Sequence, residues 1–202
     1  MTLNKKTDGQ PAKDKIITVS NLLSLSRIVI VIPIIYLLHL GNTDPVYNLA
    51  AFGVMILGGL TDTFDGLLAR KMNQITDFGK MADPVADKIG MGTILAYLAI
   101  SREDFPLWFL ILTLIRDFLI FLAGWYVRKK YNYLFTSNML GKITVSVIAL
   151  MIVVYVIKEF FGLEKFYIVL LWISTVLLIV SFFSYTIRLW KFLITVKKEA
   201  LG

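Results

Sequence analysis

The chain has 202 residues, of which 57% are hydrophobic, and its mean hydropathy is +0.75. This length is typical of one domain, and the apolar fraction exceeds the roughly 45–50% of a soluble domain. The net charge is +7, but the basic residues lie in short clusters between apolar runs, which fits anionic lipid headgroups better than nucleic acid. The chain has no cysteine, so disulfides and thiolate metal sites are excluded.

In chain order, residues 1–15 are polar, and we expect a flexible tail there, followed by one domain over residues 16–202. That domain contains six apolar runs, each long enough to cross a bilayer as a helix of about 20 residues. The runs are Val19–Leu40, Tyr47–Arg70, Gly79–Ile100, Pro106–Val127, Ser137–Val156 and Phe166–Trp190. The first is too long for the core of a signal peptide, and no small-residue cleavage site follows it. The sequence therefore predicts an all-α integral membrane protein with six transmembrane helices.

Basic residues mark the predicted orientation in the membrane. They concentrate in the N-terminal tail, in the second and fourth connections and in the C-terminal tail, whereas the other three connections are balanced or acidic. Because cytoplasmic loops carry the excess of Lys and Arg, both termini are expected in the cytoplasm. An even number of spans requires the same arrangement. We expect a multi-pass protein of the cell (inner) membrane.

Aspartates gather where the second predicted helix ends and the third begins. Residues three or four positions apart share a helix face, so the spacing predicts two polar stripes. The first consists of Asp62, Asp65, Gly66, Ala69 and Arg70, and the second of Gly79, Asp83 and Asp87. The short connection favours antiparallel neighbours, which would bring the four carboxylates into one cavity near the cytoplasmic surface.

Four unpaired carboxylates near a bilayer are unfavourable, since each costs about 2.5–3.5 kcal/mol at the centre of a membrane helix and less near the interface. Hard divalent cations such as Mg²⁺ or Mn²⁺ prefer oxygen ligands of this kind. Four carboxylates could hold two ions, the arrangement that clamps a displacement at phosphorus. A single aspartate at a helix end is usually a cap, and we interpret Asp77 in that way. The combined register is not explained by capping or packing.

The run from Asp62 to Lys88, DTFDGLLARKMNQITDFGKMADPVADK, resembles the signature of the CDP-alcohol phosphatidyltransferases, D-x2-D-G-x2-A-R-x8-G-x3-D-x3-D, at every fixed position. The resemblance implies a homodimer of six-helix subunits with a site open to the cytoplasm. It also implies that Asp62, Asp65, Asp83 and Asp87 bind two metal ions and that Asp87 is the catalytic general base. Gly66, Ala69 and Gly79 would make room for the cytidine nucleotide of a CDP-diacylglycerol donor, with Arg70 supporting the site electrostatically.

Three further basic residues are candidates for binding an anionic acceptor: Arg116, Lys142 and Arg188. Lys142 and Arg188 are equally well explained as interfacial side chains that reach toward the headgroups. Arg116 lies about ten residues into its helix, next to Asp117. Because adjacent residues do not share a helix face, a simple structural pair of these two is disfavoured.

The sequence does not decide which alcohol is the acceptor. ADPVADK and the Gly-Lys before Thr144 resemble phosphatidylglycerophosphate synthases, whose acceptor is glycerol 3-phosphate. In those enzymes Arg-Glu is common in the fourth helix with another Arg eight residues later, whereas this chain has Arg116-Asp117 and Gly124. Arg-Asp followed by Tyr126-Val127-Arg128 resembles eukaryotic-type cardiolipin synthases, which use phosphatidylglycerol. Inositol phosphate or serine is a further alternative.

Two other classes of protein use aspartates within membrane helices. Membrane prenyltransferases are expected to place their Asp-rich motifs far apart, whereas here both stripes lie between Asp62 and Asp87. Cation transporters line a path with carboxylates, but these carboxylates cluster at one end of the predicted bundle. Both alternatives are disfavoured.

Overall fold

The structure is a computed structural model that describes the backbone of residues 19–71, 77–131 and 139–199 and the side chains of residues 29–61, 88–131 and 139–196. All regular elements in the described backbone are α-helices. They are α1 (Val19–Leu40), α2 (Val46–Lys71), α3 (Asp77–Ser101), α4 (Leu107–Tyr131), α5 (Met139–Phe161) and α6 (Glu164–Glu199). Each corresponds to one of the six predicted helices, so their number and order are confirmed within the described chain.

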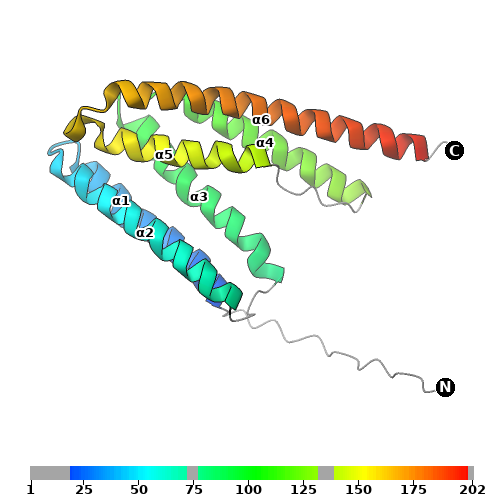
Figure 1. Ribbon diagram of the computed structural model, residues 1–202, viewed down its shortest axis with the longest axis horizontal. Helices are drawn as coiled ribbons and strands as arrows, with labels where there is room; N and C mark the ends of the chain where they lie inside the picture. Colours follow the sequence, from blue (N-terminus) through cyan, green and yellow to red (C-terminus); the bar gives the residue numbers. More distant parts are fainter. Residues whose placement is uncertain (1–18, 72–76, 132–138, 200–202) are drawn as a thin grey trace, which may run out of the picture.

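The helices form two groups of three that meet at one end and diverge toward the other (Figure 1). In the first group, α1 packs against both α2 and α3; in the second, α6 packs against α4 and α5. Contacts of α2 with α5 and of α3 with α4 join the two groups. The connections 41–45, 102–106 and 162–163 lie together at the end where the groups meet, which we call the loop end (Figure 1). The aspartate-rich ends of α2 and α3 lie at the opposite end.

Membrane character is clearest in the second group. Leu107–Tyr131, Met139–Phe161 and Glu164–Val196 are each long and apolar enough to cross a bilayer. The described apolar segments of the first group are shorter: Val29–Leu40, Val46–Thr61 and Lys88–Ser101. Large apolar side chains point outward on both groups; Ile32 is 67% exposed and Phe121 is 68% exposed. Such surfaces are unfavourable in water and suit contact with lipid chains.

The helices of the loop end begin and stop at residues suited to these positions. Asp44 Oδ1 accepts a hydrogen bond from the backbone N–H of Val46 at 3.0 Å, which caps the start of α2. At the end of α5, Gly162 has φ of 65°, and the N–H of Leu163 donates to the carbonyl of Lys158 at 2.8 Å. This is a Schellman motif, in which a glycine adopts the left-handed conformation and satisfies a terminal carbonyl.

The sixth helix is longer than the sequence indicated. Its apolar run predicted an end near Trp190, but α6 continues to Glu199 and contains 36 residues. At 1.5 Å per residue this corresponds to about 54 Å, well beyond a hydrocarbon core of roughly 30 Å. Hydropathy marks where a helix leaves the apolar layer and not where its backbone hydrogen bonds stop.

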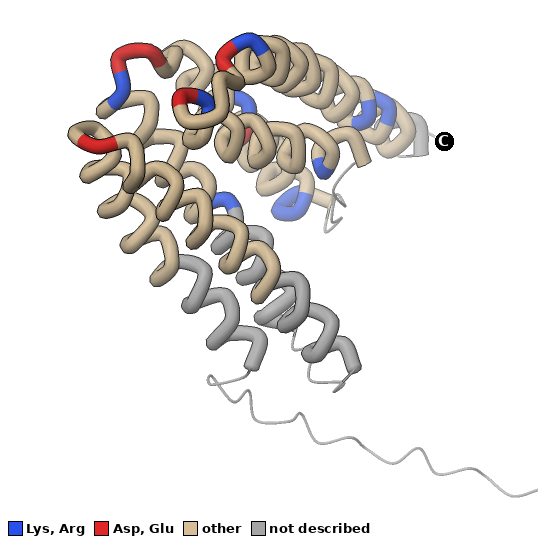
Figure 2. Tube along the Cα trace, turned by 60° about the vertical axis from the view of Figure 1, so that its left-hand side comes forward, with Lys and Arg blue, Asp and Glu red and all other residues tan. Residues whose placement is uncertain are grey.

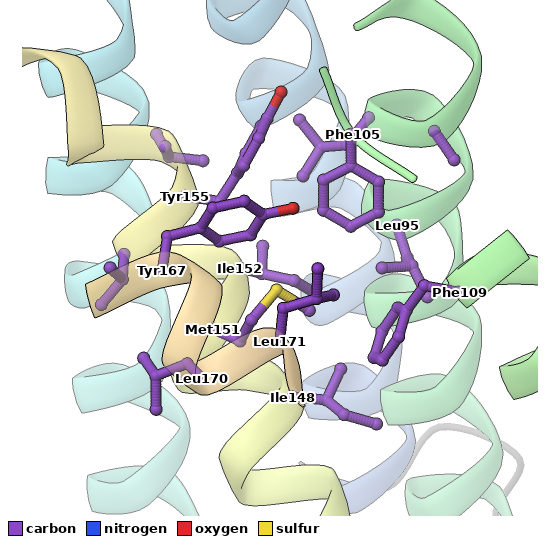
Figure 3. Packing of buried hydrophobic residues seen from close by; sticks show 14 of the residues in the cluster. Leu95, Phe105, Phe109, Ile148, Met151, Ile152, Tyr155, Tyr167, Leu170 and Leu171 are labelled. Atoms are coloured by element: carbon purple, nitrogen blue, oxygen red, sulfur yellow. The ribbon is translucent and has the colours of Figure 1, made fainter. Parts of the chain in front are cut away.

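The buried core lies close to the loop end and joins both groups of helices (Figure 3). Phe105, in the α3–α4 connection, stacks edge to face with Tyr155 at a centroid distance of 4.9 Å. Tyr155 in turn contacts Tyr167 at 5.1 Å, and Phe109 and Met151 are fully buried beside them. Edge-to-face pairs of this kind add about 0.5–1.5 kcal/mol beyond the area they bury.

Polar contacts at the loop end tie the α3–α4 connection to both groups. Arg102 Nη2 donates to the carbonyl of Leu38 at 3.1 Å and to Asn48 Oδ1 at 2.9 Å. Asp104 forms an ion pair with Lys158 and accepts a hydrogen bond from the hydroxyl of Tyr155 at 2.6 Å. The two basic residues of this cluster therefore bind protein groups, although the buried Nε of Arg102 has no partner in the described chain.

Acidic and basic residues are distributed unevenly between the two ends of the molecule. Figure 2 shows the acidic segments of the described chain gathered mainly at the loop end, whereas basic segments also occupy the half toward the C terminus. The last turn of α4, for example, carries Arg128, Lys129 and Lys130. The loop-end connections carry fewer Lys and Arg residues than the segments at the other end, which is the asymmetry that sets orientation.

Replacing Asp104 by Asn should lower the stability of the fold at neutral pH and not in acid. Partial burial opposes ionisation of Asp104, but hydrogen bonds from Lys158 and Tyr155 outweigh it and hold its pKa below the usual 3.8. Such a carboxylate stabilises the fold above pH 3.8, and the contribution disappears as pH falls through the lowered pKa. Because Asp104 is 51% exposed, we expect a loss of only about 1 kcal/mol at pH 7.

Thermal unfolding in detergent over a pH series from pH 7 down through the lowered pKa of Asp104 would measure this difference. Glu103→Gln is the matched control, because Glu103 is the exposed neighbour in the same connection. Equal effects of Asp104→Asn and Glu103→Gln at pH 7 would contradict the proposed role of the ion pair.

Candidate functional site

The aspartate-rich segment is helical on both sides of its connection. Residues 62–71 continue α2 to its end at Lys71, and residues 77–87 form the first part of α3. The two helices run in opposite directions (Figure 1), as predicted, but in the described chain they make no extensive contact with each other, so their expected pairing as direct neighbours is not confirmed. Their extensive contacts within the described chain are with α1, which packs against both.

The side chains of this segment lie outside the described part of the chain. They include the predicted metal ligands Asp62, Asp65, Asp83 and Asp87 and the predicted nucleotide-binding residues Gly66, Ala69, Arg70 and Gly79. The helical backbone gives each stripe the register that its spacing requires, and convergence of the four carboxylates stays a prediction. Among the side chains that the structure does describe, no group of three or more Asp, Glu or His forms a candidate metal site.

The described part of the site centres on Arg116, which is 9% exposed in the middle of α4. Its Nη1 donates to Asp117 Oδ1 at 2.6 Å, and its Nη2 donates to Ser181 Oγ on α6 at 3.0 Å. Its Nε is buried and has no hydrogen-bond partner among the described residues. A buried guanidinium with an unused donor is suited to binding an additional anionic acceptor.

The pair of Arg116 with Asp117 corrects the sequence-based interpretation. We expected adjacent residues not to pair because their Cβ atoms lie on different helix faces. The arginine side chain is long enough to bring its guanidinium back to the neighbouring carboxylate, and the ion pair forms within one turn. The rule for helix faces describes Cβ positions and does not limit a side chain with four rotatable bonds.

Asp117 also connects this site to the aspartate-rich segment. Its Oδ2 lies 3.6 Å from Nζ of Lys88 on α3, the residue that directly follows Asp87. One carboxylate thus lies between a cation on α3 and a cation on α4. The α3–α4 contact places Arg116 next to the helix that carries two of the predicted metal ligands.

The other two acceptor candidates are exposed. Lys142 lies in the first turn of α5, directly after Gly141, and a Cβ at Gly141 would lie 3.6 Å from Arg116 Nη2. The start of α5 is therefore adjacent to the guanidinium. Arg188 is on α6, seven residues after Ser181 and so on the same face. No described contact joins either side chain to Arg116, and their role as acceptor-binding residues stays a prediction.

Sequence reasoning missed Ser181 and Lys88. Ser181 is 3% exposed and is one of few polar residues in the apolar half of α6. Its position about two helical turns before Arg188, on the same face of α6, was the sequence signal that could have identified it. Lys88 follows the last signature aspartate, but only the fold shows that it approaches Asp117.

A family model of the CDP-alcohol phosphatidyltransferases matches residues 17–185. The chain belongs to this family. Its relatives include a protein of Wigglesworthia glossinidia brevipalpis named CDP-diacylglycerol–glycerol-3-phosphate 3-phosphatidyltransferase, 32% identical over 173 residues that cover 84% of this chain and 93% of the relative. A protein of the same name from Aquifex aeolicus is 32% identical over 175 residues, covering 84% of this chain and 94% of the relative.

A third relative of that name, from Rickettsia typhi, is 41% identical over 102 residues. This match covers 50% of the chain and 54% of the relative, so the chain spans about half the length of that protein. Family membership rests on the longer matches. It agrees with the resemblance found in the aspartate signature, and it establishes a transferase of the membrane-associated CDP-alcohol type.

Replacing Asp117 by Asn should destabilise the protein through Arg116. The substitution keeps the size of the side chain but leaves a buried cation without its counter-charge, which should cost roughly 1–3 kcal/mol. In an Arg116→Gln background the same substitution should cost much less, because no buried cation remains. Thermal unfolding of the four proteins in detergent forms a double-mutant cycle. Additive effects would show that the two side chains do not act as a pair.

Proposed function

We propose that the protein synthesises a phospholipid by transferring the phosphatidyl group of CDP-diacylglycerol to glycerol 3-phosphate, which gives phosphatidylglycerophosphate and CMP. The main support is the family match over residues 17–185, together with relatives of that named activity that align along more than nine-tenths of their length. These names favour glycerol 3-phosphate over phosphatidylglycerol, inositol phosphate or serine as the acceptor.

The buried guanidinium of Arg116 agrees with this choice. Glycerol 3-phosphate carries a dianionic phosphate, and arginine binds phosphate with short, charge-assisted hydrogen bonds. Arg116 already has one carboxylate partner, so a second anion would use its remaining donors, among them the buried Nε. Lys142, in the first turn of α5, and Arg188, in the C-terminal third of α6, would add positive charge.

The four aspartates of α2 and α3 form an all-oxygen donor set that fits two Mg²⁺ or Mn²⁺ ions. When bound, such ions would neutralise the diphosphate of the donor and the charge of the departing CMP. Gly66, Ala69 and Gly79 are small enough to let the cytidine nucleotide approach the helix backbones, and Arg70 would compensate its charge.

The proposed reaction is a direct displacement. Asp87 accepts the proton of the acceptor hydroxyl, whose oxygen forms a bond to the phosphorus that carries diacylglycerol. The bond from this phosphorus to the bridging diphosphate oxygen breaks, and CMP leaves with the electron pair. Positive charge from Arg116 holds the acceptor phosphate away from the attacked phosphorus while its hydroxyl end approaches Asp87.

Purified protein in detergent should release CMP from CDP-diacylglycerol only when Mg²⁺ and glycerol 3-phosphate are both present. Asp87→Asn should reduce this rate by about 10²–10⁴-fold, the usual contribution of a general base. Asp77→Asn is the matched control: it lies at the start of the same helix, at a variable position of the signature, and Asn caps helices as well as Asp does.

The alternative acceptors are tested in the same assay. CMP release with phosphatidylglycerol and not with glycerol 3-phosphate would change the assignment to cardiolipin synthesis. Release with inositol phosphate or serine alone would likewise replace the proposed acceptor while retaining the reaction class. An equal loss of activity in Asp77→Asn and Asp87→Asn would argue against a catalytic role for Asp87.

The proposal extends to topology and assembly. Six spans with both termini in the cytoplasm put the aspartate-rich ends of α2 and α3 on the cytoplasmic side of the inner membrane, where CDP-linked donors and glycerol 3-phosphate are accessible. The positive residues at the end of α4 and the balanced charges of the loop end support this orientation. The family resemblance supports a homodimer.

Because the chain has no native cysteine, single-cysteine variants report topology directly. Lys130→Cys should react with a membrane-impermeant maleimide only after the cells are opened, whereas Asn42→Cys in the α1–α2 connection should react in intact spheroplasts. The opposite labelling pattern would show that the protein has the reverse orientation in the membrane. Sedimentation of these purified variants in detergent should give twice the chain mass of 22.9 kDa, and a single chain mass would contradict the dimer.

A further inference from the structure

The environment of Arg116 contains a hydroxyl whose hydrogen-bonding role is fully determined. Ser181 Oγ donates its only proton to the carbonyl of Leu178 at 3.0 Å, so it interacts with Arg116 Nη2 through an oxygen lone pair. Ser181 is 3% exposed, and water cannot readily replace it as an acceptor. The serine on α6 therefore fixes the position of Nη2, one of the two terminal nitrogens of the Arg116 guanidinium.

The second terminal nitrogen is held by Asp117 at 2.6 Å. A guanidinium is planar, so contacts at Nη1 and Nη2 fix the orientation of the whole group, and with it the direction of the N–H on Nε. That N–H is buried and unused within the described chain. Burying an unpaired charged donor is unfavourable, so this N–H is available to an anion from outside the protein. The Nε of Arg102 is also buried and unpaired, but Arg102 lies at the loop end, opposite the aspartate-rich ends of α2 and α3.

We propose that Ser181 is a positioning residue, which orients the Arg116 guanidinium so that its free N–H groups bind the phosphate of the acceptor. This inference rests on the proposed function, since it assigns Arg116 to the anionic end of glycerol 3-phosphate. Asp117 alone fixes only one edge of the guanidinium, and its own contact with another helix is the 3.6 Å pair with the half-exposed Lys88 on α3. Ser181 supplies the anchor from another helix.

The proposal predicts a selective change in acceptor binding. Ser181→Ala removes one acceptor and no charge, so the KM for glycerol 3-phosphate should rise about tenfold, as expected for one hydrogen bond to a charged group. The KM for CDP-diacylglycerol and kcat at saturating acceptor should change less than about twofold, because the metal site and general base lie on α2 and α3.

Ser174→Ala is the matched control. Ser174 is on the same helix two turns earlier, is fully buried, and its Oγ has no hydrogen-bond partner in the described chain. Its replacement makes the same chemical change in the same apolar surroundings and should leave both KM values unaltered. In an Arg116→Gln background, Ser181→Ala should add no further increase, because the residue acts through Arg116.

Several outcomes would overturn the positioning role while the proposed function stands. The first is an active wild-type protein in which Ser181→Ala leaves the KM for glycerol 3-phosphate unchanged. The second is an equal change in the KM values for glycerol 3-phosphate and CDP-diacylglycerol. The third is a further tenfold increase in the KM for glycerol 3-phosphate when Ser181→Ala is added to Arg116→Gln. Wild-type protein without CMP release dependent on glycerol 3-phosphate would overturn the proposed function, and the role of Ser181 with it. A selective, tenfold effect that is absent from Ser174→Ala would establish it.

Discussion

Charge buried among apolar helices must find its partners within the protein, and this requirement governs the rest of the structure. In a lipid environment helices gain little from hydrophobic association with one another, so packing and polar contacts between helices decide how they are arranged. Arg116 meets the requirement with Asp117 on its own helix and Ser181 on α6. At the loop end, Lys158 meets it with Asp104.

Both polar sites include an arginine whose buried Nε has no partner in the described chain, Arg102 at the loop end and Arg116 on α4, but the two sites differ in their place in the fold. At the loop end the charged groups of Lys158 and Asp104 satisfy each other, and the hydroxyl of Tyr155 adds a further hydrogen bond. This arrangement holds the two groups of helices together and supplies a rigid base. Arg116 has a buried, unpaired Nε–H and lies beside the helix that carries Asp83 and Asp87. The chemistry is thus expected at the end where the helices diverge, away from the end that fixes their spacing.

The helices themselves were predictable because apolar runs of 20 or more residues have one stable backbone structure in a bilayer. The end of α6 was not predictable, because the apolar run stops where the helix leaves the membrane and the helix itself continues to Glu199. The aspartate stripes were predicted from spacing and from family resemblance, and the structure confirms only the helical backbone that carries them, because their side chains lie outside the described residues. The contacts of Arg116 were not predictable: its pair with Asp117 depends on side-chain reach, and its bond to Ser181 depends on how α4 packs against α6.

The central claim is that the acceptor hydroxyl attacks the lipid-linked phosphorus of CDP-diacylglycerol directly. The most direct measurement uses glycerol 3-phosphate labelled with oxygen-18 in its 1-hydroxyl, followed by mass spectrometry of all products. The account predicts a lipid product that retains the label in its phosphodiester and an equal amount of unlabelled CMP. Phosphatidic acid together with a CMP ester of glycerol 3-phosphate that carries the label in its phosphodiester would show attack at the cytidine-side phosphorus. An unlabelled lipid would show transfer to water. Either result would contradict the direct attack on the lipid-linked phosphorus.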